Sequence, residues 1–292
     1  MRRPSVGAHF DSWLSSILRF FGRRRRRRSS GEPVYFDRLK HLSDDEWRAA
    51  LAESPDKAAR WVYAAATYGN IDAQIMWGQM LLDGYGTPRD DEGAFRWFGI
   101  AAKSKRADAV NMLGRCHERG GGAPVDFEKA AACYRAAAEQ SFDWAQFNLA
   151  CLMLDGKGAP QDRDGAFALF MKAVEQGHVK SFNMIGRFYE HGWGRPRDMT
   201  TAAEWYRRSA EGGDFRGQYR YGHLLFERGL PDDALPLLRL AVDNAPVELC
   251  RQFAGELLGR PEPRLQEIGA LAQARAGGDE TNPGTSAGLR RS

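Results

Sequence analysis

A pattern of small and turn-forming residues recurs every 36 positions and limits what this chain can fold into. A small residue occupies one position of the pattern five times, at Gly78, Gly114, Ala150, Gly186 and Gly222. Four loops in the same register read DGYGTPRD, RGGGAPVD, DGKGAPQD and HGWGRPRD, beginning at residues 83, 119, 155 and 191. Self-similarity at a fixed spacing of 20 to 50 residues is the signature of a repeat architecture. We therefore expect similar units stacked along the chain.

Each repeat predicts two helices joined by a glycine-containing turn. Ala73, Trp77, Gly78 and Leu81 have the i, i+4, i+5, i+8 spacing of one helix face, and small residues there let a second helix approach closely. Glycines end this first helix, and the aspartate that closes each loop can cap the second helix. Because neither amphipathic helix can bury its apolar face alone, neighbouring repeats must pack together. The predicted fold is all-α, a right-handed α/α superhelical solenoid of helix-turn-helix repeats.

The pattern also resembles a known family. Ala-x-x-x-Leu-Gly-x-x-Tyr-x-x-Gly-x-Gly, followed by Asp, Lys-Ala-x-x-Trp-Tyr and Ala-Ala, resembles the Sel-one-like repeat (SLR) family, a relative of the tetratricopeptide repeats. The best copy is Ser181–Arg216, and the resemblance covers residues 57–245. The repeats depart from the pattern at Ala150 for glycine, His117 and Met153 for tyrosine, and Cys133 and Leu169 for tryptophan. The resemblance implies a scaffold for protein partners.

The register of the repeats predicts five segments. We expect an amphipathic helix with an arginine-rich stretch in residues 1–32 and an atypical N-terminal capping repeat in residues 33–72. Four 36-residue repeats follow in residues 73–216. Residues 217–260 form a shortened repeat, whose loop omits four residues, and a C-terminal capping helix. We expect the glycine-, alanine- and proline-rich residues 261–292 to be disordered.

The sequence does not predict catalysis, a cofactor or a metal site. The glycine loops lack the Gly-x-x-x-x-Gly-Lys-Ser/Thr pattern that holds phosphate. Cys116 and His117 lie side by side but occupy packing positions of the repeat, and His178, His191 and His223 are isolated from metal-ligand spacings. The four cysteines do not cluster, which favours free thiols in a reducing, cytoplasmic environment.

The first helices of the repeats predict a partner-binding surface. By analogy with tetratricopeptide repeats, the first helices line the concave face of the solenoid, where the partner binds, and their third and seventh positions face inward. Asn111 and Arg115, like Asn183 and Arg187, lie one helical turn apart, and arginine can bind a peptide carboxylate through two donors. The predicted partner contacts are Asn111, Arg115, Phe147, Asn183, Arg187, Tyr219 and His223. The alternative is that these residues are merely a polar, solvated helix face.

The N-terminal segment stands outside the repeat pattern. Residues 1–32 contain nine arginines and two acidic residues, a net charge of +7, so the remaining residues carry −3 of the overall +4. An apolar stripe of helical spacing precedes six consecutive arginines. A helix of this kind can lie in the interface of an anionic membrane. The predicted membrane or anion contacts are Trp13, Leu14, Ile17, Leu18, Phe21, Arg23, Arg24, Arg25, Arg26, Arg27 and Arg28.

Several functions fit these features. The leading prediction is a non-catalytic scaffold or adaptor with a protein or peptide partner and no small-molecule substrate. It would be cytoplasmic and held on the inner face of a membrane by the N-terminal segment. The alternative is a nucleic-acid-associated protein acting through its arginines. Docking of the segment on the solenoid or on a partner, a localisation signal and an unstructured arm are further alternatives.

Overall fold

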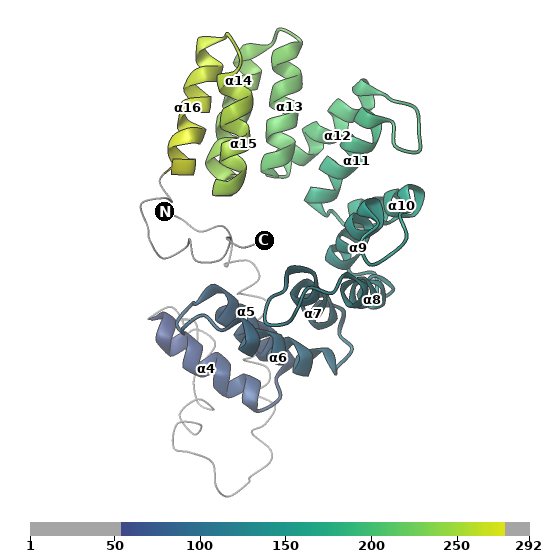
Figure 1. Cartoon of the computed structure of the whole chain (residues 1–292), viewed down its shortest axis with the longest axis vertical. Helices are drawn as coiled ribbons and strands as arrows, with labels where there is room; N and C mark the ends of the chain where they lie inside the picture. Colours follow the sequence, from purple (N-terminus) through teal and green to yellow (C-terminus); the bar gives the residue numbers. More distant parts are fainter. Residues whose placement is uncertain (1–53, 278–292) are drawn as a thin grey trace, which may run out of the picture. The chain divides into compact units, whose positions relative to one another are not determined.

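The computed structural model describes residues 54–277, and every regular element in this range is an α-helix (Figure 1). The chain divides after Gln161 into two compact units, each described by itself. The prediction of an all-α helical-repeat solenoid is confirmed. The N-terminal segment of residues 1–32 and residues 33–53 of the expected capping repeat lie outside the described residues.

The described part of the first unit holds six helices. They are α4 (Pro55–Thr67), α5 (Ile71–Asp83), α6 (Asp91–Ala102), α7 (Ala107–Arg119), α8 (Phe127–Ala138) and α9 (Asp143–Asp155). Successive helices pack against each other, and the first helices of neighbouring repeats also touch, α5 on α7 and α7 on α9. The first helices therefore form one layer of this unit.

The part of the second unit that the structure describes, residues 162–277, holds seven helices. They are α10 (Arg163–Glu175), α11 (Val179–His191), α12 (Met199–Glu211), α13 (Phe215–Glu227), α14 (Pro231–Asn244), α15 (Val247–Leu258) and α16 (Pro263–Gly277). Here α11 touches α13 in the first-helix layer, and α14 touches α16 in the second-helix layer. Figure 1 shows α13 to α16 side by side.

The loop residues act as the sequence predicts. Gly84, Gly120, Gly156 and Gly192 end their helices in the left-handed conformation, with φ of 63°, 74°, 67° and 67°. The closing aspartates cap the second helices: the carboxylates of Asp90, Asp126, Asp162 and Asp198 accept hydrogen bonds from backbone N–H groups three residues on, at 2.8 to 3.1 Å.

Small residues allow the two helices of a repeat to meet closely. A Cβ atom added to Gly78 would lie 2.6 Å from the Phe98 ring, and one added to Gly186 would lie 2.5 Å from the Tyr206 ring. Both rings are fully buried. The close approach inferred from the small-residue positions is confirmed.

Each full-length loop rests on the repeat before it. A Cβ added to the second loop glycine would strike the carbonyl oxygen of the residue that begins the preceding second helix: Gly86 at Pro55 (2.0 Å), Gly122 at Asp91 (2.1 Å) and Gly158 at Phe127 (1.9 Å). In the second unit, a Cβ added to Gly194 would lie 2.7 Å from a carboxylate oxygen of Asp164, in the first turn of α10. The glycine is thus required by a contact between repeats as well as by its backbone conformation.

The prediction of disorder from residue 261 is wrong for residues 263–277, which form α16. Leu265, Ile268 and Ala272 of this helix are buried and pack into the same core as Phe253 and Leu257 of α15. The apolar residues recur at helical spacing, but many are alanine and glycine, so the composition masks the pattern. Consequently α15 is the first helix of a further pair rather than a terminal capping helix.

Candidate partner-binding surface

The first-helix face is the surface carried by α5, α7 and α9 in the first unit and by α11, α13 and α15 in the second. In the first unit, Asn111 is 4% exposed, and its side-chain oxygen accepts a hydrogen bond from Nδ2 of Asn148 on α9 at 3.0 Å. This amide pair links neighbouring repeats. The sequence analysis did not predict a role for Asn148. The same position of the repeat holds a methionine in three other repeats, at Met76, Met112 and Met184.

Arg115 lies one turn after Asn111 and is half-buried. Its guanidinium contacts the sulfur of Met112 at 3.3 Å, and it forms no ion pair with a carboxylate of residues 54–277. Burial lowers the pKa of Arg115, and the nearby charge of Arg119 lowers it further. A guanidinium nevertheless stays protonated in proteins, so this position holds a partly desolvated positive charge that an incoming anion would stabilise. Phe147 is half-buried on the neighbouring helix α9.

In the second unit, an aromatic loop residue joins the predicted site. Asn183 is 3% exposed, and its side-chain oxygen has no hydrogen-bond partner among the described residues. The Arg187 guanidinium lies 5.1 Å from the ring centre of Trp193, and the His191 ring stacks on Trp193 at 4.8 Å. The sequence analysis did not predict Trp193 as a site residue, because it lies in a loop. The sequence feature that could have revealed it is its large side chain at a position that holds Tyr85, Gly121 and Lys157 in the other loops.

Glu190 contacts three polar side chains, including that of His191. One of its carboxylate oxygens accepts the hydroxyl of Tyr206 at 2.5 Å and a guanidinium N–H of Arg220 at 2.9 Å, and lies 3.7 Å from Nε2 of His191. Burial lowers the pKa of His191, Glu190 opposes this effect, and Arg187 and Arg220 add to it. The positive charges around His191 therefore favour its neutral imidazole.

Tyr219 contacts α15, and His223 contacts Arg260, which follows α15. Tyr219 is 7% exposed, stacks on Phe253 with ring centres 3.9 Å apart, and donates its hydroxyl to Glu256 at 2.7 Å. His223 lies 2.8 Å from a guanidinium nitrogen of Arg260 and 3.4 Å from Glu227. The structure thus places both residues on the first-helix face, Tyr219 largely covered and His223 half-exposed. Partner contact by these residues, as by Asn111, Arg115, Phe147, Asn183 and Arg187, stays a prediction.

The cysteine and histidine at positions 116 and 117 have packing partners. Cys116 is 3% exposed, and burial raises the pKa of its thiol to about 11. The His117 ring packs edge-on against Phe95 at 5.3 Å, and burial lowers its pKa. Over residues 54–277, no three His, Cys, Asp or Glu side chains gather as metal ligands would. In the same range, no helix is long and apolar enough to span a bilayer.

The stacked helix pairs and the glycine loops define an all-α helical-repeat protein. The family model for the Sel1 repeat matches residues 71–105, 107–142, 145–178 and 183–214. The chain is a Sel1-like repeat protein, as its motif resemblance predicted. Proteins of this kind are generally scaffolds for protein interactions.

Solved structures share this fold. A Sel1 repeat protein from Oxalobacter formigenes has a TM-score of 0.61 and 24% identity, covering 75% of this chain and 99% of that one. The SLR-fold protein c5321, a protective antigen of uropathogenic Escherichia coli, has a TM-score of 0.56 and 26% identity over 78% of this chain; the match spans half of that protein. The immunity protein Pa5087 from Pseudomonas aeruginosa has a TM-score of 0.52 and 13% identity, covering 74% of this chain and 84% of that one, which shows the fold alone. No curated protein sequence matches the chain.

Proposed function

We propose that this protein is a non-catalytic scaffold or adaptor that captures an acidic segment of a protein partner on its first-helix face. The observation that supports it most directly is Arg115, a half-buried guanidinium without a carboxylate ion pair in residues 54–277. A charge that is partly removed from water without a counter-ion destabilises the free protein, and a bound carboxylate would offset that cost. Arginine suits this role because its donors can bind both oxygens of a carboxylate.

Neighbouring polar groups favour a peptide over an isolated small anion. The Asn111–Asn148 amide pair lies beside Arg115, and an amide can donate and accept hydrogen bonds with a peptide backbone. In the second unit, Trp193 offers an aromatic surface between Arg187 and His191, next to the second predicted Asn–Arg pair. Aromatic side chains with arginines are typical of the residues that dominate binding energy in protein interfaces.

Capture of a partner by variants of the full chain tests the proposal. The native protein, with its N-terminal segment intact, is used to purify and identify the partner, and acidic peptides from that partner are then titrated. Arg115→Ala is expected to weaken binding about tenfold, because it removes a charge-assisted contact of about 1.5 to 3 kcal/mol. Arg119→Ala is the matched control, since Arg119 is exposed on the same helix one turn later. Full affinity in an Arg115→Ala/Arg187→Ala double variant of unchanged helicity would contradict the proposal.

We further propose that residues 10–28 attach this cytoplasmic scaffold to an anionic membrane surface. The support is the sequence alone: Trp13, Ile17 and Phe21 share an apolar stripe, and Arg23–Arg28 follow it. Each arginine near an anionic surface contributes about 1 kcal/mol. Flotation with anionic vesicles is expected for the full chain and not after deletion of residues 1–30, with uncharged vesicles as the control. Equal flotation of both proteins would refute attachment, and co-purification with nucleic acid at high salt would point to the alternative partner.

A further inference from the structure

The shortened loop of the second unit leaves part of α12 uncovered. The second loop glycine lies 31 residues after the residue that it contacts in three repeats: Gly86 on Pro55, Gly122 on Asp91 and Gly158 on Phe127. The same spacing would bring residue 230 of a full-length loop onto Met199, where α12 begins. The loop between α13 and α14 is four residues too short for this, and Gly229 has no atom within 4 Å of where its Cβ would be.

A pocket lies beside the uncovered start of α12. The pocket at the matching positions of the first unit, lined by Asp56, Ala59 and Tyr63, has the full-length loop as one of its walls, and that wall is missing here. The pocket beside α12 measures about 440 Å³ and is lined by Thr200, Thr201, Ala203, Glu204, Arg207, Tyr221 and Arg228. A second pocket, of about 360 Å³, shares Arg207 and Tyr221 with it, so the two form one groove. This exit groove is carried by α12, α13 and α14. It includes the second-helix layer, whereas the predicted partner contacts lie on the first-helix face.

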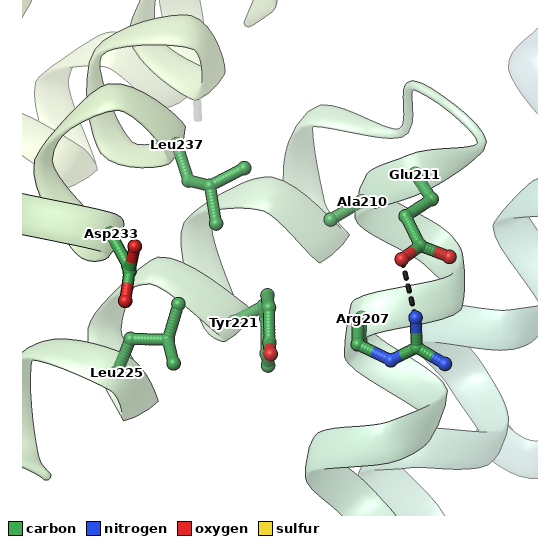
Figure 2. Close-up of a pocket in the computed structure, with 7 residues that line it drawn as sticks. All are labelled: Arg207, Ala210, Glu211, Tyr221, Leu225, Asp233 and Leu237. Atoms are coloured by element: carbon green, nitrogen blue, oxygen red, sulfur yellow. Dashed lines mark hydrogen bonds and ion pairs between the residues drawn. The ribbon is translucent and has the colours of Figure 1, made fainter. Parts of the chain in front are cut away.

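The second pocket of the exit groove, the one of about 360 Å³, has an apolar floor and an acidic rim. Figure 2 shows Tyr221 and Leu225 of α13 and Leu237 of α14 lining it, with Ala210 opposite. On the α12 side, Arg207 pairs with both Glu204 and Glu211, at 2.6 Å and 2.5 Å. Across the pocket, Asp233 forms no ion pair with another described residue. The groove is therefore lined by three carboxylates and two arginines, one of which already pairs with two of the carboxylates.

We propose that the exit groove is a docking site for a Gly-x-Gly turn that carries a basic residue and belongs to a partner protein. The repeats themselves show what fits here, because a turn of this type covers the same part of the second helix in four other places. Only glycine allows the turn to approach the start of the helix, where a Cβ would meet backbone or the first-turn carboxylate. The incoming turn supplies the missing wall of the pocket beside Tyr221, and its basic residue pairs with Asp233.

The test uses a cyclic peptide with the sequence of residues 189–198, Tyr-Glu-His-Gly-Trp-Gly-Arg-Pro-Arg-Asp, which includes a loop that covers α10 within this chain. Fluorescence anisotropy is expected to show saturable binding to the full chain. A peptide with Gly194→Ala is expected to bind at least about tenfold more weakly, because its Cβ would meet the start of α12. Grafting residues 192–201 in place of residues 228–233 restores a full-length loop and is expected to abolish binding while helicity is retained.

A second variant keeps the proposal testable if the graft does not fold. Asp233→Lys reverses an exposed charge at the rim and is expected to weaken peptide binding about tenfold, whereas Glu248→Lys, exposed on α15, is expected to leave it unchanged. Failure of the parent protein to bind the peptide, or equal affinity of parent and variants, would overturn the proposal. The proposal would also be overturned if the parent protein self-associates and the grafted variant does not, because the groove would then bind a second copy of this chain.

Discussion

Replacing Gly186 by alanine tests whether close helix approach, rather than helix propensity, governs the stability of a repeat. The new Cβ would lie 2.5 Å from Cε1 and 2.7 Å from Cδ1 of the Tyr206 ring, about 1 Å inside an ordinary carbon contact. The ring has little room to move, because Tyr206 is 1% exposed and its hydroxyl is bonded to Glu190, which also holds Arg220.

The substitution Gly186→Ala has effects of opposite sign on the free energy of unfolding. Overpacking a well-filled core costs about 1 to 3 kcal/mol, and displacing the ring also weakens a hydrogen bond to a carboxylate worth about 1.5 to 3 kcal/mol. Alanine in a helix interior regains about 1 kcal/mol over glycine. We therefore expect a net loss of about 2 kcal/mol. For a folded region of about 150 to 250 residues, such as residues 54–277, a loss of about 2 kcal/mol lowers Tm by about 4 to 8 °C.

Thermal and urea unfolding followed by circular dichroism measure the effect. Gly255→Ala is the matched control: Gly255 lies in α15 of the same unit, and nothing lies within 4 Å of where its Cβ would be. This variant gains only the higher helix propensity of alanine over glycine, so it is expected to be about 1 kcal/mol more stable. If Gly186→Ala were stabilised as much as Gly255→Ala, the contact between the helices would not be what requires glycine.

Three further predictions concern acid, thiols and the last helix. Side-chain hydrogen bonds from Lys129 to Asp126 and from Thr201 to Asp198, together with the backbone capping bonds, hold the pKa of both aspartates below the usual range. Their stabilisation is therefore present above about pH 4 and is lost as pH falls through the lowered pKa. Replacing both with asparagine, which still caps but does not titrate there, should make the urea midpoint less sensitive to pH below about 4; an unchanged slope would refute this. Because burial raises the pKa of Cys116 to about 11, iodoacetamide at about pH 8 should alkylate it about a hundredfold more slowly than an ordinary thiol, as read by mass spectrometry, whereas labelling as fast as that of a model thiol would contradict its burial. Arg275 of α16 donates to the carbonyl oxygens of Val242 and Ala245, so Arg275→Ala should lower stability by about 1 kcal/mol, and no change in the urea midpoint would show that the bond contributes nothing.

The sequence was most informative where one residue type has one structural use. Glycines at helix ends, capping aspartates and small residues at helix contacts each have a local physical cause, and the structure places them as expected. The helix of residues 263–277 was missed because alanine and glycine supply much of its packed face. Such residues carry little hydrophobic signal even when they are fully buried.

The candidate site was less accessible from the sequence. The periodicity puts Asn111 and Arg115 on one face of a helix, but it does not reveal the hydrogen bond between Asn111 and Asn148, which joins residues 37 apart. Trp193 beside Arg187 depends on the path of a loop. The four omitted residues were visible in the sequence, but the groove beside the shortened loop depends on how α12, α13 and α14 pack.

The contact between each loop and the preceding repeat also bears on how the chain folds and how such a chain grows. The contact between Gly122 and Asp91, and the hydrogen bonds that join Asn111 to Asn148 and Tyr219 to Glu256, span 31 to 37 residues. Tertiary contacts of such short range carry a small entropic cost of loop closure, so low contact order and rapid, stepwise folding are expected. A duplicated 36-residue segment would arrive with both halves of this contact, the glycine that reaches back and the helix start that receives the next loop. Duplication can therefore lengthen the array without new surfaces, and the shortened loop between α13 and α14 marks a repeat that does not reach back in this way.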